Sequence, residues 1–263
     1  MRTVVVSLLN SALAYIYAGE IYQLSAMYPD SKIDHLLSHS QKAQVMIPPQ
    51  ARQKPINAMD PATSPFLPLP YPSSSIHYIR SSRLSTLVQS SQIPQLLAEC
   101  HRVLMPGGVL ELRFMDAAPP RHCMGPNLAA WLEERLLLKL EADFRCSRPL
   151  ALIPEWAKQA GFVPMASAVQ ESEPPESLKR NGFVRCLRLP AAKARAPMAD
   201  RTRVLVELGL LLGRTLWKDT WGSYIADVEG EEQWWWDSDM ILSECEDWGT
   251  VFEVATLVVV KEA

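Results

Sequence analysis

Glycine is scarce in this sequence, and its distribution is uneven. The chain of 263 residues contains 11 glycines, and Gly19 is the only one before Gly107. Loops that cradle phosphate groups need several closely spaced glycines, because the backbone must approach the ligand and adopt positive φ angles. The part of the chain before Gly107 therefore contains neither a P-loop nor the glycine fingerprint of dinucleotide-binding proteins.

Paired cysteines and an excess of basic charge are also missing. The five cysteines are widely spaced and form no CxxC pair, which argues against a disulfide framework or a zinc site and indicates thiols in the reducing cytoplasm. With 26 basic and 29 acidic residues, the net charge is -3, so no overall basic field attracts nucleic acid or an anionic membrane. We expect a small-molecule substrate, with a protein partner or a second copy of the chain as further alternatives.

The N-terminal residues fit two interpretations. Met1 and Arg2, followed by the apolar run from Val4 to Ala18, have the outline of a secretory signal. The β-branched run Val4 to Val6, followed by the helix-capping pair Asn10-Ser11, equally predicts a buried strand and a helix. The unpaired cysteines favour the strand and helix.

Alternating strand and helix patterns predict an α/β fold. Residues 75–80 have a strand pattern, residues 92–104 form an amphipathic helix pattern, Pro106-Gly107-Gly108 ends it, and residues 109–115 alternate as a second strand. A strand, a helix and a strand in succession imply parallel pairing with a right-handed crossover. The proline-dense residues 48–72 are expected to be an irregular loop.

The second half of the chain predicts further helices and a closing strand. We expect helices over residues 127–144, with Asn127 as N-cap, 154–160, 204–217 and 240–248, and strands over residues 162–169 and 250–260. Hinges rich in proline, alanine and charge lie at residues 171–176 and 189–199. The expected organisation is an α/β core over 1–170, a helical insertion or lid over 171–238, and the last helix and closing strand of the core over 239–263.

Four blocks of the sequence resemble the Rossmann-like (class I) S-adenosylmethionine-dependent methyltransferases. The run LLAECHRVLMPGGVLELRFMD, residues 96–116, resembles the family's helix, turn and strand. FLPLPYPSSSIHYIRSSRL, residues 66–84, is similar to the loop and fourth strand of its fungal small-molecule, secondary-metabolite type. IPEWAKQAGF, residues 153–162, and SECEDWGTVFEVATLVVVK, residues 243–261, resemble its penultimate helix and closing strand. The resemblance implies a mostly parallel sheet with an antiparallel closing strand, methyl transfer to a small organic molecule, and S-adenosylmethionine as cofactor.

The first half departs from that family at the glycine-rich loop. The corresponding residues are Ala14-Tyr15-Ile16-Tyr17-Ala18-Gly19, with one glycine and two tyrosines. Bulky Tyr15 and Tyr17 would occupy cofactor volume, which predicts weak or absent binding of the methyl donor. The cofactor contacts that the resemblance implies are Gly19, Asp34 near the ribose, Asp60 near the adenine amine, and Ser81 and Arg83 after the fourth strand.

Three interpretations follow from this departure. The first is a methyltransferase that acts on a small organic molecule. The second keeps the fold without methyl transfer, as a binding or scaffold subunit, a pseudoenzyme, or a non-methylating cyclase. The third is that the true chain starts elsewhere and carries a glycine loop that these 263 residues omit.

Several polar residues have a structural interpretation beside the functional one. Asp60-Pro61 also fits the start of a turn, and the segment Ser81 to Arg83 also fits a solvated turn. Glu111 and Arg113 share a strand face, where burial would make each pair with a neighbour. His35 and His39 have metal-ligand spacing but no suitably spaced third ligand, so we expect no metal. No catalytic base can be assigned.

All eight tryptophans lie in the second half of the chain. They fit an aromatic wall for a flat apolar substrate, or the packed core of a lid. The core interpretation is favoured. Residues 217–263 hold 12 acids and two bases, which makes a polyanion a poor partner for this region.

Overall fold

The computed structural model describes residues 4–8, 22–27, 29–38, 51–56, 67–165, 184–193, 199–225 and 234–262. Its contacts divide the chain into two compact units. The core unit comprises Met1–Phe114, Leu150–Arg185 and Ala255–Ala263, and the helical unit comprises Met115–Pro149 and Cys186–Val254. The boundaries expected near residues 170 and 238 stay a prediction.

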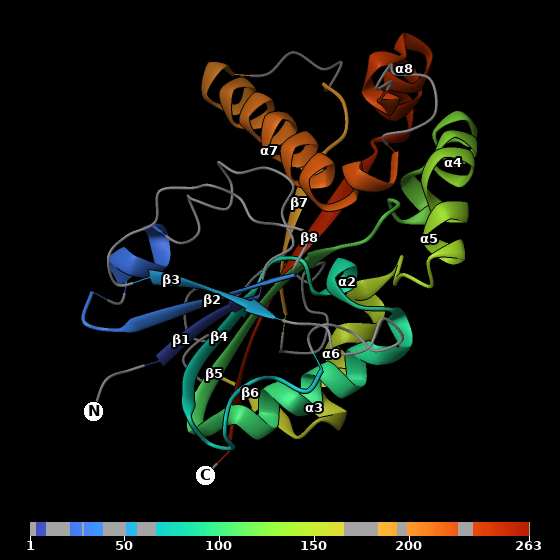
Figure 1. The fold of residues 1–263 in the computed structure, drawn as a ribbon. Coiled ribbons are helices and arrows are strands. Elements are labelled where there is room, and N and C mark those ends of the chain that lie inside the picture. The colour runs from blue at the N-terminus through green and yellow to red at the C-terminus, as the bar shows by residue number, and fades with distance from the viewer. Residues whose placement is uncertain are drawn as a thin grey trace. The chain divides into compact units, whose positions relative to one another are not determined.

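The described residues form eight strands in one sheet (Figure 1). The strands are β1 (Val4–Leu8), β2 (Lys32–Ser38), β3 (Ala51–Ile56), β4 (Ile76–Ser81), β5 (Leu104–Met115), β6 (Phe162–Pro164), β7 (Val184–Pro190) and β8 (Val251–Lys261). Their order is β3-β2-β1-β4-β5-β8-β6, and β7 also pairs with β8. Pairing is parallel from β3 to β5 and antiparallel between β6 and β8. The expected fold class, a mostly parallel sheet with an antiparallel closing strand, is confirmed.

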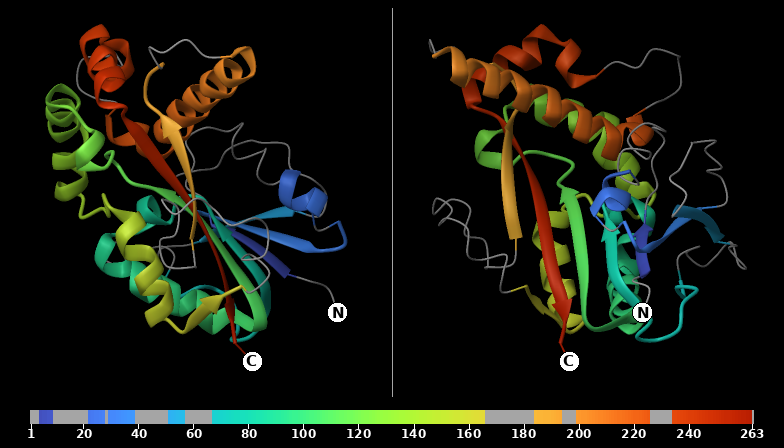
Figure 2. Two further views of the ribbon diagram at one scale, coloured as in Figure 1. Left: turned by 180° about the vertical axis from the view of Figure 1, so that it is seen from behind. Right: turned by 90° about the vertical axis from the view of Figure 1, so that its left-hand side faces the viewer.

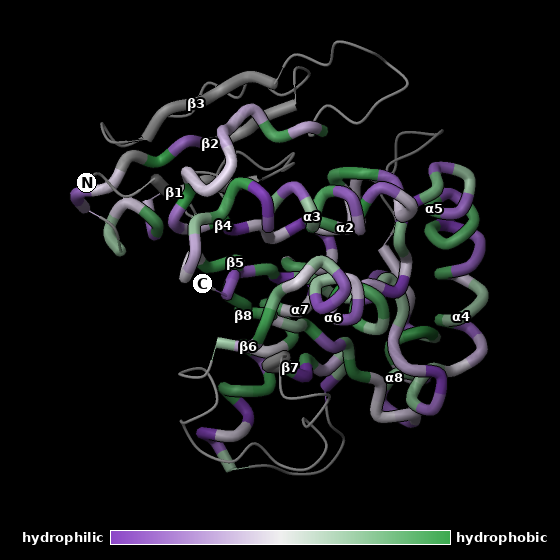
Figure 3. Tube along the Cα trace, turned by 90° about the horizontal axis from the view of Figure 1, so that it is seen from below, coloured by the Kyte–Doolittle hydropathy of each residue, from purple (hydrophilic) through white to green (hydrophobic). Residues whose placement is uncertain are grey.

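Helices cover both faces of the sheet in the core unit. The helices α3 (Ile93–Val103) and α6 (Pro149–Gln159) lie on one face, and a helical turn over residues 22–27 lies on the other (Figures 1 and 2). The apolar positions of α3 are buried because they recur at helical spacing, and Pro94 occupies its first turn, where its missing N–H costs nothing. The predicted helix at 92–104 is confirmed. Figure 3 shows β5 and β8 largely in the colour of hydrophobic residues, as expected for interior strands.

Two expectations about proline were wrong. Residues 48–72 were expected to be irregular, but β3 lies within them and includes Pro55. Because β3 is the edge strand of the sheet, one side of its backbone needs no ladder partner, and a proline is tolerated there. The helix expected to begin at Pro154 begins at Pro149, so Pro154 lies inside it and removes one backbone hydrogen bond without ending the helix.

In the helical unit, the helix expected over 127–144 is divided. It consists of α4 (Pro126–Leu132), a π-helical segment (Glu133–Leu137) and α5 (Leu138–Ala142). Asn127 is not its N-cap. The carboxylate of Glu244 accepts hydrogen bonds from the backbone N–H groups of Asn127 and Leu128, both at 2.9 Å, and thereby caps the helix from a distant part of the chain. A side chain at Gly125 would collide with Glu244, so this close approach requires glycine.

The remaining helices agree with the sequence pattern more closely. The helix α7 (Asp200–Ile225) includes the expected span 204–217 and is longer at both ends. The helix α8 (Asp239–Trp248) ends at Gly249, whose φ of 56° is the left-handed cap that glycine favours. Tryptophan side chains form much of the core of the helical unit, where Trp217, Trp221 and Trp235 are fully buried, so the core interpretation agrees with the structure.

In the part of the chain that the structure describes, every helix is too short or too polar to cross a membrane.

Candidate functional site

The topology of the core unit defines where a ligand is expected. Strands β1 and β4 are neighbours, and Leu8 at the end of β1 pairs with Ser81 at the end of β4. The chain leaves β1 toward β2 on one side and leaves β4 toward β5 on the other. Connections that diverge in this way leave a crevice at the carboxyl ends of the two strands, which is where open parallel sheets bind ligands.

The segment after β4 lies at the carboxyl end of that strand, where the topology predicts this crevice. Ser81 is fully buried, Arg83 is 5% exposed, and the short helix α2 (Leu84–Leu87) that follows is buried throughout. The hydroxyl of Thr86 donates a hydrogen bond to the carbonyl oxygen of Arg83 at 3.0 Å, and the backbone N–H of Thr86 donates to the same carbonyl. The β4–α2 turn is therefore ordered by its own hydrogen bonds and is not a solvated surface turn.

Ser85 in this turn is one of several buried side chains, Trp221 and Trp235 among them, with a polar atom that has no hydrogen-bond partner. Its side chain is fully buried, and its hydroxyl oxygen has no hydrogen-bond partner. A buried hydroxyl without a partner costs roughly 1–3 kcal/mol, so such groups are rare unless a ligand or water completes them. Sequence reasoning missed Ser85, because nothing local distinguishes it from the other serines of the segment.

A charged cluster lies directly beneath the end of β4. The carboxylate of Glu111 on β5 lies 3.5 Å from Arg80 Nε and 3.2 Å from Arg113, and it accepts a hydrogen bond from the hydroxyl of Tyr78. Arg80 is 1% exposed and also donates to Gln23 Oε1 at 3.3 Å. The prediction that Glu111 and Arg113 pair with neighbours is confirmed. The cluster fixes the strand that carries Ser81.

Of the residues predicted to contact the cofactor, the structure describes some and not others. Ser81 and Arg83 lie together at the crevice, whereas Gly19 and Asp60 lie outside the described residues. Asp34 is 1% exposed and lies within β2, where it is paired with Val6 and not at the end of the strand. Its carboxylate accepts a hydrogen bond from the Tyr71 hydroxyl at 3.0 Å. A role of Asp34 toward a ribose stays a prediction.

The described residues do not form a metal site around the two histidines that have metal-ligand spacing. His35 lies on β2, and His39 lies outside the described residues. Among the residues that the structure describes, no three His, Cys, Asp or Glu side chains lie close enough together to hold a metal ion.

The titratable groups of the helices are poorly suited to catalysis. Burial raises the pKa of Cys100 to about 12 and that of Cys245 to about 11, so both thiols stay protonated and unreactive. Burial also lowers the pKa of His101, whose ring packs edge-on against Phe162. The crevice instead offers hydroxyl and guanidinium donors, which can bind and orient a polar ligand.

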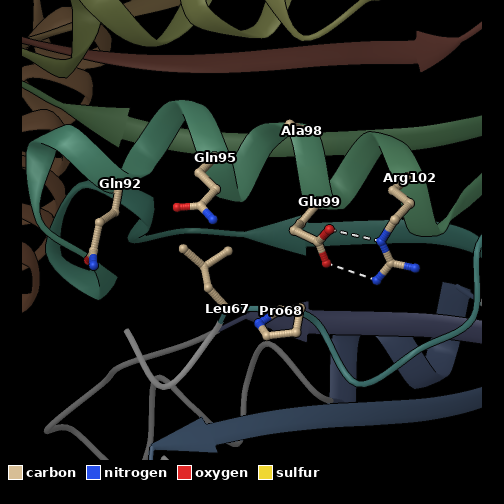
Figure 4. A pocket seen from close by; sticks show the side chains of 7 residues that line it. All are labelled: Leu67, Pro68, Gln92, Gln95, Ala98, Glu99 and Arg102. Atoms are coloured by element: carbon tan, nitrogen blue, oxygen red, sulfur yellow. Dashed lines mark hydrogen bonds and ion pairs between the residues drawn. The ribbon is translucent and has the colours of Figure 1, made fainter. Parts of the chain in front are cut away.

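A pocket of about 450 Å³ lies along α3 (Figure 4). Its charged residues are Glu99 and Arg102, which form two hydrogen bonds of 2.8 Å with each other. Arg102 also donates to the carbonyl oxygens of Leu69 and Tyr71, and Glu99 accepts from the Leu69 N–H. These hydrogen bonds hold the loop before β4 against α3, so the two charged residues of the pocket have a structural role. None of its lining residues belongs to the β4–α2 turn.

Comparisons with known proteins find similarity in structure alone. The sequence matches no protein-family model, and no curated protein is similar to it in sequence. Among solved structures, the cyclopropane synthase MmaA2 from Mycobacterium tuberculosis is similar with a TM-score of 0.51 at 16% identity, over 99% of this chain and 78% of that chain. Phosphoethanolamine N-methyltransferase 2 from Haemonchus contortus, in complex with S-adenosyl-L-methionine, gives a TM-score of 0.49 at 10% identity, and the chain spans 50% of its length.

Proposed function

We propose that this chain is an S-adenosylmethionine-dependent methyltransferase that acts on a small organic molecule and holds the donor weakly. The donor site is the crevice at the carboxyl ends of β1 and β4. The observation that carries the proposal is the buried β4–α2 turn, which contains the unpartnered hydroxyl of Ser85 and follows the carboxyl end of β4, the edge at which open parallel sheets bind ligands.

The described residues fit a polar nucleoside ligand. Ser81 and Arg83 are polar side chains shielded from water at the carboxyl end of β4, and shielding strengthens any hydrogen bond that they make to a ligand. When bound, S-adenosylmethionine supplies an electrophilic methyl group. The chain's own contribution is to orient the ligand and exclude water, because methyl transfer by direct displacement depends mainly on the alignment of donor and acceptor. A dedicated base is not required for this role.

The second candidate function keeps the fold and the crevice without methyl transfer, as a binding or scaffold subunit or a non-methylating cyclase. Gly19 is the only glycine before Gly107, and Tyr15 and Tyr17 stand in the segment that corresponds to the glycine loop. Side chains of this size take up volume that the donor would need. The fungal secondary-metabolite type rests on the sequence resemblance and the cytoplasmic setting on the unpaired cysteines, and both are part of the proposal.

Titration with S-adenosylmethionine and S-adenosylhomocysteine separates the two candidates. We expect a dissociation constant of about 100 μM, equivalent to roughly -5.5 kcal/mol, because the tyrosine-bearing loop weakens an otherwise complete site. Isothermal calorimetry of the full chain measures it. A sub-micromolar constant would contradict weak donor binding, and the absence of binding at millimolar ligand would exclude the methyltransferase.

Replacing Ser85 by alanine tests the site itself. We expect Ser85→Ala to weaken donor binding about tenfold, and to leave the free energy of unfolding of the ligand-free protein unchanged or raised by about 1 kcal/mol, because the unpaired hydroxyl is removed. Ligand-observed NMR and urea denaturation measure the two effects.

The matched control for Ser85→Ala is Thr86→Val, which removes a hydroxyl that is already paired with the Arg83 carbonyl. This variant should lose about 1 kcal/mol of stability and keep its donor affinity. If Ser85→Ala binds the donor as tightly as the unaltered chain, the hydroxyl of Ser85 does not contact the ligand.

A further inference from the structure

The N-terminal half of α7 carries an exposed apolar stripe. Its five members are exposed by 40–67%: Val204, Leu205, Leu208, Leu211 and Leu212. Side chains at this spacing lie on one side of a helix. Together they form a continuous patch of roughly 500 Å², as large as the largest apolar patch of a typical monomer, and such patches usually have a partner.

A different side of α7 packs within the helical unit, where Leu210 and Gly213 are buried. A Cβ atom at Gly209 would lie 3.2 Å from Pro190, and one at Gly213 would lie 3.2 Å from Leu189. The absence of side chains at these two positions lets α7 approach the end of β7 closely. The stripe lies on the remaining, exposed part of the helix circumference.

The stripe is symmetric about Leu208. Val204 and Leu205 precede Leu208 by four and three positions, and Leu211 and Leu212 follow it by three and four. An antiparallel helix pair with two-fold symmetry requires this arrangement, because each residue before the axis meets one after it on the partner. Leu208 then meets Leu208, and Val204 meets Leu212.

The area of the stripe and the charges at its ends are consistent with a second copy of the chain as its partner. Two stripes would bury roughly 1,000 Å² in total, the lower limit for a specific interface. Asp200 and Arg201 lie beyond one end of the stripe, and Lys218 and Asp219 lie beyond the other. Each end of the stripe therefore carries one charge of each sign, so an antiparallel pair sets no net charge against a net charge of the same sign.

We therefore propose that α7 pairs with α7 of a second copy of this chain, in an antiparallel arrangement with Leu208 on the two-fold axis. The proposal does not depend on the proposed function.

Sedimentation velocity of the full chain tests the pairing. We expect a dimer of twice the chain mass of 29.5 kDa, with a dissociation constant on the order of 10 μM, as suits a small interface. Leu208→Glu should weaken it at least 100-fold, because two carboxylates would meet on the axis. Met240→Glu is the matched control, since Met240 is 62% exposed on α8 of the same unit, and it should leave the dimer unchanged.

Cysteine cross-linking tests the register without adding charge. Leu208→Cys should form a disulfide-linked dimer on oxidation, and Val204→Cys mixed with Leu212→Cys should do the same. Val204→Cys alone should not, because two copies of residue 204 lie about 12 Å apart along an antiparallel pair.

A native chain that stays monomeric at about 200 μM, well above the expected dissociation constant, overturns the proposal. So does a Leu208→Glu variant that dimerises normally, or Val204→Cys alone cross-linking as well as Leu208→Cys. Binding of a monomeric chain to lipid vesicles would identify a membrane as the occupant instead.

Discussion

Trp217→Ala is expected to lower the free energy of unfolding by about 3–5 kcal/mol, the cost of removing a large buried aromatic side chain. Trp217 is fully buried, and its ring lies within 6.5 Å, centre to centre, of the rings of Trp131, Trp234, Trp235, Trp236 and Phe252. Its indole N–H also donates to the carbonyl oxygen of Ala117 at 3.1 Å. Alanine would leave a cavity among these rings and an unpaired buried carbonyl.

Urea denaturation followed by far-UV circular dichroism measures this loss. Trp248→Ala is the matched control, because Trp248 is 48% exposed at the end of α8, and its removal should change stability by less than about 0.5 kcal/mol. A loss below about 1.5 kcal/mol for Trp217→Ala would contradict the close packing of the aromatic cluster.

Elements whose boundaries are local could be predicted from the sequence. The helix α3 has apolar residues at helical spacing and a proline in its first turn. The stop predicted at Pro106-Gly107-Gly108 was wrong, because α3 ends at Val103 and these three residues lie within β5. The end of α8 was predictable from Gly249, which adopts the left-handed cap. The order of strand, helix and strand patterns predicted the parallel sheet. The sheet in turn predicted the edge, at the carboxyl ends of its strands, where Ser81 and Arg83 lie.

Features that depend on distant contacts could not be predicted. Asn127 looked like a helix cap, but Glu244 fills that role across 117 positions of sequence. Pro55 argued against a strand, and only the edge position of β3 makes it acceptable. The strand β7 lay unrecognised between two segments that resemble hinges, because its pairing with β8 is not visible locally. Ser85 stands out only once its burial and its missing partner are known.

The ion pair beneath the candidate site leads to the second large expected effect. Glu111→Ala should lower the free energy of unfolding by about 3–5 kcal/mol, because Arg80 would remain buried after losing its ion pair with Glu111. Arg80 is 1% exposed, and the distance from its Nε to the Glu111 carboxylate is 3.5 Å. Thermal or urea denaturation of the full chain measures the loss.

A double variant separates the effect of charge on stability from the effect of side-chain volume. Arg80→Met combined with Glu111→Leu removes both charges and keeps the volume, and it should recover most of the lost stability, since an apolar pair of similar size is often as stable as a buried ion pair. The surface control is Glu253→Ala, which breaks the pair with Arg188 at 3.2 Å and should cost less than about 1 kcal/mol, because Arg188 is 44% exposed. If the double variant is as unstable as Glu111→Ala, the broken ion pair between Arg80 and Glu111 is not the cause. Recovery would show that breaking this ion pair, and not the loss of side-chain volume, lowers the stability of Glu111→Ala.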